Sequence, residues 1–115
     1  MQTRPKKLEA IFYRTKAGTE PVRDWLKTFS KTEKKIIGED IKTVQFGWPL
    51  GMPIVDSLAQ GLWEIRIKLM GGKICRIIFF MENNTMVLVS GFIKKTQKTP
   101  NHELALSLKR KKQYD

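Results

Sequence analysis

The 115-residue sequence predicts a single α+β domain, in which a small twisted sheet carries two early helices on one face. Residues 21–44 repeat apolar side chains at helical spacing, and residues 62–92 contain three short apolar strands in succession. The length suits one compact domain, and no repeat, low-complexity tract or linker divides it. We therefore expect one domain over residues 1–115, with the element order β-α-α-β-β-β-α.

The first part of the chain supplies one strand and two helices. Residues 8–14, LEAIFYR, combine aromatic and branched side chains and end at the breaker KAGTEP, which indicates a strand. Pro21 suits the first turn of a helix. The apolar side chains of that helix recur on one face, at Val22, Trp25, Leu26 and Phe29. Ser30 and Glu33 match a capping box for a second helix, whose apolar stripe continues to Val44.

The second part supplies three strands and a last helix. A loop rich in Pro and Gly, residues 48–61, comes first. The strands are LWEIRIKL, KICRIIFF and TMVLVSGF, joined by MGG and NN turns. Thr99 and Pro100 can then open a helix that has Leu104 and Leu108 on one face.

The length of the MGG turn decides which side chains share a face of the sheet. A two-residue Gly-Gly turn would put Arg76 opposite Ile67 on the apolar face, where a charge without a partner is costly. A three-residue loop with Gly72 in a left-handed conformation pairs Leu69 with Lys73 instead. Because a slip of one residue turns every side chain over, we favour the three-residue loop.

This register sorts the strands into an apolar face and a charged face. The apolar face, which can receive the helices, holds Trp63, Ile65, Ile67, Leu69, Cys75, Ile77, Phe79 and Met81. On the other face, expected to be open, Arg66 lies directly opposite Arg76, beside Glu64 and Lys68. Like charges placed opposite each other are destabilising. Either the pair grips phosphate, for which the guanidinium fork is well shaped, or Glu64 pairs with one arginine while the other is solvated.

The basic residues are concentrated in parts of the chain. The formal net charge is +11, of which residues 1–16, 61–91 and 92–115 contribute +4, +2 and +5, while residues 17–60 are neutral. Such a localised excess indicates a polyanionic partner, most often nucleic acid, although solvated lysines are the alternative.

Three lysines, Lys94, Lys95 and Lys98, fall within GFIKKTQKTP. They follow the strand expected to neighbour KICRIIFF, so they can reach the surface of the two arginines and complete a cationic groove. An ordinary solvated loop is the competing interpretation.

Several classes of protein are disfavoured. No run approaches the roughly 18 apolar residues of a membrane span, and the N-terminus lacks an apolar signal region, so we expect a cytoplasmic protein without membrane association. The single cysteine, Cys75, excludes an internal disulfide. With one histidine, His102, it makes a metal site improbable, and no cofactor is expected.

The segments GLWEIRIKLMGGKICRIIFF and GFIKKTQKTP together resemble the phage-derived branch of the HigB-type toxins, in the RelE/ParE superfamily. The resemblance covers nearly the whole chain. It implies a compact RelE-like fold and a toxin of a type II toxin–antitoxin system that cuts mRNA in the ribosome. It also implies a helix-turn-helix antitoxin as partner.

The resemblance also implies the residues of the site. The basic positions of the family fall on the two arginines and on the lysines of IKKTQK. We expect catalytic roles for Arg66, Arg76, Lys95 and Lys98, and RNA-binding roles for Lys68, Lys73, Phe92 and Lys94. His102 and Tyr114, the late candidates for a general acid or base, lie outside any matching family motif.

RNA can be cleaved without a metal, because its 2′-OH can attack the adjacent phosphate. Arg66 and Arg76 would stabilise the charge of the transition state, and a lysine whose pKa is lowered by neighbouring cations could act as the base. Two alternatives remain. One is a ParE-like inhibitor of DNA gyrase, and the other is a non-catalytic RNA-binding module.

Overall fold

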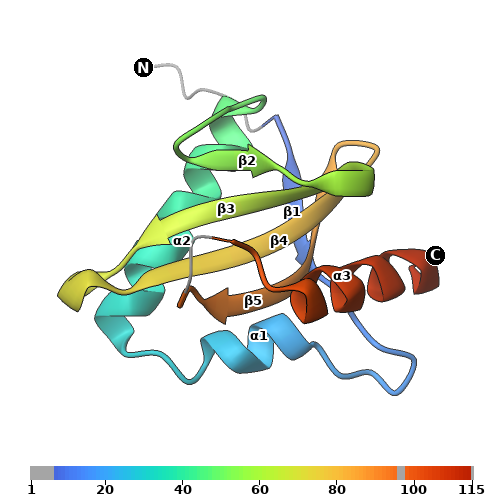
Figure 1. The fold of residues 1–115 in the computed structure, drawn as a ribbon, viewed down its shortest axis with the longest axis horizontal. Coiled ribbons are helices and arrows are strands. Elements are labelled where there is room, and N and C mark those ends of the chain that lie inside the picture. Colours follow the sequence, from blue (N-terminus) through green and yellow to red (C-terminus); the bar gives the residue numbers. More distant parts are fainter. Residues whose placement is uncertain (1–6, 96–97, 115) are drawn as a thin grey trace.

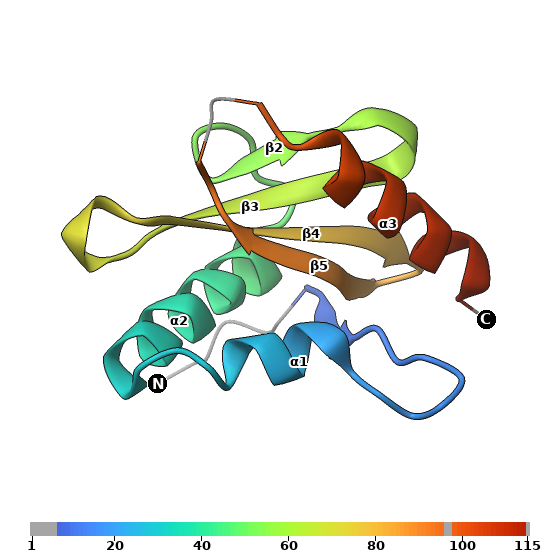
Figure 2. The same cartoon turned by 60° about the horizontal axis from the view of Figure 1, so that its bottom comes forward.

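A computed structural model describes residues 7–95 and 98–114 as one mixed five-stranded sheet with helices on both faces. The elements are β1 (Glu9–Phe12), α1 (Pro21–Leu26), α2 (Lys31–Gly47), β2 (Val55–Ser57), β3 (Leu62–Lys68), β4 (Ile74–Glu82), β5 (Thr85–Ile93) and α3 (Asn101–Gln113). Figures 1 and 2 show α1 and α2 on one side of the sheet and α3 on the other. The predicted α+β class is confirmed.

The sheet contains one strand more than predicted. Its order is β1-β5-β4-β3-β2, with β1 parallel to β5 and the other neighbours antiparallel. Strand β2 lies inside the segment predicted as the loop 48–61, where it pairs Val55 with Ile65 of β3. A strand of three residues, shortly after Gly51 and Pro53, is too short to show alternation. Only the pairing with β3 makes this segment a strand.

The capping box that was predicted for the second helix is present. The Ser30 hydroxyl accepts a hydrogen bond from the Glu33 backbone N–H at 3.1 Å, and the Glu33 carboxylate accepts one from the Ser30 N–H at 3.1 Å. Helix α1 ends at Leu26, earlier than its apolar pattern suggested, yet Phe29 still packs against the core. No helix in the described residues is long and apolar enough to cross a membrane.

The predicted register is also confirmed. The Leu69 N–H donates to the Lys73 carbonyl at 2.8 Å, and Gly72 has a φ of 78°, as a three-residue loop requires. Arg66 lies opposite Arg76 in the β3–β4 pairing. The apolar face packs against α1 and α2 and contains fully buried side chains at Ile65, Ile67, Cys75, Ile77 and Phe79.

The charged face is not open, which corrects the expectation from sequence. A second apolar cluster lies there, formed by Tyr13, Leu62, Ile78, Phe80, Val87 and Val89, with Leu104, Leu108 and Tyr114 packed against it. Helix α3 covers this cluster because its own apolar stripe needs burial (Figure 2). As a result Arg76 is only 3% exposed.

Candidate anion-binding site

A pocket of about 380 Å³ lies on the α3 side of the sheet, where β2, β3 and β4 meet the segment that leads into α3. Three basic side chains line it: Arg66, Arg76 and Lys98. The other lining residues are Asp56, Leu58, Thr99, Asn101 and Leu104. Of the four predicted catalytic residues, Arg66 comes from β3 and Arg76 from the neighbouring β4, while Lys98 comes from the loop after β5.

Arg76 is held in this pocket by a buried carboxylate. Its Nη1 donates to Oε1 of Glu64, whose side chain is 0% exposed against 4% for Arg76. The hydroxyl of Thr99 donates to the other carboxylate oxygen of Glu64, Oε2, at 2.8 Å. The proposed pairing of Glu64 with one arginine is therefore present, and it lies in the interior and not at the surface.

The other two nitrogens of the Arg76 guanidinium have no acceptor. Nε and Nη2 are buried and have no hydrogen-bond partner among the described residues. Their N–H groups form one edge of the guanidinium, which is the arrangement that holds two oxygens of a phosphate or carboxylate. A buried donor without an acceptor costs about 1–3 kcal/mol. This edge is therefore a candidate binding site for an anion, which would supply the missing acceptors.

Two further cations surround Arg76. Arg66 is half-buried and lies 3.6 Å from the sulfur of Met52 through its Nη1. Lys94 extends the pairing beyond β5, because its N–H donates to the Ile74 carbonyl at 2.7 Å. Burial lowers the pKa of Lys94, and the charges of Arg76 and Arg66 lower it further, while Glu64 opposes them. The positive potential of the site therefore extends to this lysine.

The remaining predicted residues lie around the pocket or away from it. Lys68 is exposed on β3 and shares with Arg66 a neighbouring hollow, lined also by Asp40 and Ile54. Lys95 is exposed on the lysine segment, whose residues 96–97 lie outside the described part of the chain. Phe92 is paired with Arg76 across β4 and β5, and it packs against the second apolar cluster.

Lys73 does not join this site. Its ammonium group lies 2.7 Å from the carboxylate of Glu33, which belongs to α2. The hairpin tip turns this lysine toward the α2 side, so the structure does not bring it to the pocket, and its RNA-binding role stays a prediction.

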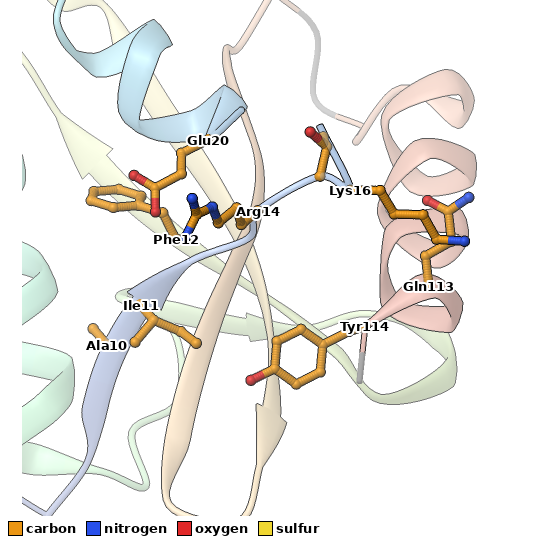
Figure 3. A pocket seen from close by; sticks show the side chains of 9 residues that line it. Ala10, Ile11, Phe12, Arg14, Lys16, Glu20, Gln113 and Tyr114 are labelled. Carbon is orange, nitrogen blue, oxygen red and sulfur yellow. The ribbon is translucent and has the colours of Figure 1, made fainter. Parts of the chain in front are cut away.

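The two late candidates for an acid or base are also elsewhere. His102 is exposed at the start of α3, where its Nε2 lies 3.3 Å from Glu103. Tyr114 stacks edge-on against Phe80, with ring centroids 5.3 Å apart. Figure 3 shows it facing a separate hollow beside Ile11 and Arg14. That hollow is larger, about 660 Å³, but it contains none of the buried unpartnered donors that distinguish the Arg76 pocket in the described residues.

Among the pocket residues that sequence reasoning missed are Asp56 and Thr99. Asp56 reaches it because β2 pairs Asp56 with Glu64, and this strand was not predicted. Thr99 was interpreted only as part of a helix start, although its hydroxyl also binds Glu64. The position of Thr99 next to the lysine cluster was the available signal. Within the described residues, no group of three His, Cys, Asp or Glu side chains is placed to hold a metal ion.

These features define the class of protein: a small, strongly basic α+β domain with an arginine-lined pocket on its sheet. The model of the phage-derived Gp49-like family (DUF891) matches residues 24–112, which is most of the chain. The chain belongs to this family of toxins from toxin–antitoxin systems, of the RelE/ParE-like class. A search of the curated proteins found no match.

Proposed function

We propose that this protein is a HigB-type, RelE-like toxin that cleaves mRNA in the ribosome, in the cytoplasm, and is held inactive by a helix-turn-helix antitoxin. The family supports a toxin with an antitoxin partner. The observation that carries the enzymatic part is the Nε/Nη2 edge of Arg76, which is buried without an acceptor beside a pocket that Arg66 and Lys98 also line. A protein with a net charge of +11 is attracted to the phosphate backbone of nucleic acids, so a phosphate of RNA is our choice for the anion.

In the proposed reaction the 2′-oxygen of the substrate attacks the adjacent phosphorus, and the bond from phosphorus to the 5′-oxygen breaks. Nε and Nη2 of Arg76 bind the two non-bridging oxygens, and Arg66 adds a second positive charge as negative charge develops on them. Nε and Nη2 are enclosed. Side chains at the mouth of the pocket must therefore move as the substrate enters, which alignment on the ribosome would promote.

The proton of the attacking 2′-OH needs a base, and the 5′-oxygen needs an acid. Lys94 is our candidate for the base, because its pKa is lowered by burial and by the two arginines. Lys98, which lines the pocket, is our candidate for the acid that protonates the leaving oxygen. Lys95, which is exposed, would then contribute positive charge for the binding of RNA. Asp56 is the competing base, since it is the other titratable side chain on the pocket wall outside the arginines and Lys98.

Single-turnover cleavage of ribosome-bound mRNA by Arg76 variants tests the proposal. Arg76→Lys keeps the charge but removes the two-nitrogen edge, so cleavage should fall by roughly a hundredfold, as for loss of one oxyanion donor. Arg23→Ala is the matched control, because it removes one cation from exposed α1 on the opposite side of the sheet. Cleavage by Arg76→Lys within about twofold of the unaltered protein would contradict the assigned role.

Expression of the unaltered protein in growing bacteria, together with RNA-binding assays, separates the alternatives. A gyrase inhibitor would damage DNA on expression while protein synthesis continued, and a simple RNA-binding module would hold RNA without cutting it, with or without ribosomes. We expect arrest of translation instead, together with cut mRNA.

A further inference from the structure

The acid at the centre of this cationic site has a particular geometry. Glu64 is 0% exposed, and its two oxygens are used by different donors, one by Nη1 of Arg76 and one by the hydroxyl of Thr99. A carboxylate beside an arginine often binds it through two parallel hydrogen bonds. Here the second oxygen is occupied, so Glu64 binds Arg76 through a single nitrogen.

We propose that Thr99 and Glu64 act as a pair of positioning residues: Thr99 holds Glu64 in single contact with Arg76 and so keeps the Nε/Nη2 edge available for a phosphate group. Without the Thr99 hydroxyl, Oε2 of Glu64 would lose its partner in a buried place, which is costly. The carboxylate would then be free to leave Nη1 and move onto the Nε/Nη2 edge, whose two donors lack an acceptor, and would compete there with the ligand.

This arrangement links Arg76 on β4 to the segment that leads into α3. Thr99 directly follows Lys98, which lines the same pocket, and it precedes Pro100 and the first turn of α3. The carboxylate that orients the arginine of β4 therefore also anchors the end of the lysine segment. Binding of a phosphate at Arg76 and the position of Lys98 are coupled through Glu64.

Inorganic phosphate is the probe for the first test, with the Arg76 side-chain N–H resonance followed by NMR in full-length protein. In Thr99→Val the affinity for phosphate should fall by about tenfold, the effect of losing a charge-assisted hydrogen bond. Thr99→Ser, which keeps the hydroxyl, should restore it. Thr28→Val is the matched control, because it also removes a hydroxyl that donates a hydrogen bond, to the Trp25 carbonyl at 2.6 Å beside α1.

A double-mutant cycle with Glu64→Gln gives the decisive readout. An amide has one oxygen and cannot form the competing two-point ion pair, and its nitrogen can donate to Thr99. Thr99→Val should therefore cost less than about twofold in the Glu64→Gln background, against about tenfold alone. Glu103→Gln controls for the change in net charge, since Glu103 is a partly buried carboxylate that accepts from Ser90 at 2.5 Å.

The pairing is overturned if Thr99→Val binds phosphate as tightly as the unaltered protein, or if it costs the same in both backgrounds. The chemical identity of the natural anion rests on the proposed function, but these measurements do not. If the protein fails to cut mRNA and the cycle still shows the predicted coupling, the nuclease proposal falls and the positioning role stands. If mRNA is cut and Thr99→Val cleaves at full rate, the positioning role falls alone.

Discussion

At the scale of single residues, the site depends on where Arg76 is buried. On the open face expected from the sequence, the removal of Arg76 would leave folding intact. In the structure, Arg76→Ala leaves Glu64 buried without a cation, which costs on the order of 3 kcal/mol of folding stability. A melting curve must therefore accompany every assay of this variant. Arg76→Ala combined with Glu64→Gln should recover part of that loss, because it also removes the buried charge.

Lys94 yields a prediction about pH. Its folded pKa is lowered, by burial first and then by Arg76 and Arg66, so it deprotonates at lower pH than an ordinary lysine. A base must be neutral, so the cleavage rate should rise with pH and level off above this lowered pKa. Arg66→Ala removes one of the causes and should shift the rise to higher pH.

Cleavage across a pH series, with Lys94→Arg as the comparison, measures this effect. The arginine variant keeps the charge but does not release its proton, so its residual cleavage should lack the rise. A rise that persists in Lys94→Arg would remove Lys94 as the base. In that case Asp56→Asn becomes the variant to measure.

At the scale of elements, strand β4 contributes side chains to both faces of the sheet. Cys75 lies in the α2 core and Arg76, the next residue, lies in the pocket. Burial, helped by Glu33 and Asp40, raises the pKa of the Cys75 thiol to about 12. The alternation of a strand thus separates a fully apolar environment from a cationic one by a single residue.

Helix α1 approaches β5 so closely at Gly91 that a larger residue has no room there. A Cβ built on Gly91 would lie 2.4 Å from the Trp25 ring, so Gly91→Ala must push α1 off the sheet. We expect a loss of about 1–3 kcal/mol in unfolding free energy, the usual cost of overpacking. Gly38→Ala in α2 is the control, since nothing lies within 4 Å of its Cβ and the change should stabilise by up to about 1 kcal/mol. Chemical denaturation measures both, and equal stability of the two variants would contradict the packing argument.

At the scale of the whole molecule, the sheet separates a helical α1/α2 side from the α3 side that contains the pocket (Figure 2). An antitoxin can neutralise the toxin by covering this pocket, by keeping it out of the ribosome from elsewhere on the surface, or by both. The basic character of the pocket favours an acidic partner there.

Competition decides between these modes of neutralisation. If the antitoxin covers the pocket, adding it should abolish binding of inorganic phosphate at Arg76, and Arg66→Ala should weaken the complex. The Arg23→Ala variant on the other side should bind the antitoxin normally. Phosphate binding that survives in the complex would leave exclusion from the ribosome as the mechanism.

The sequence by itself determined the α+β class, the capping box of α2 and the three-residue turn that places Arg66 opposite Arg76. These features depend on local chemistry: helical spacing, hydrogen bonds between near neighbours, and the cost of placing an arginine on an apolar face. Only the tertiary structure decided that β2 exists, that α3 covers the charged face, and that Glu64 receives both Arg76 and Thr99. Each of these depends on contacts between distant segments, and such contacts leave no period in the sequence from which they could be inferred.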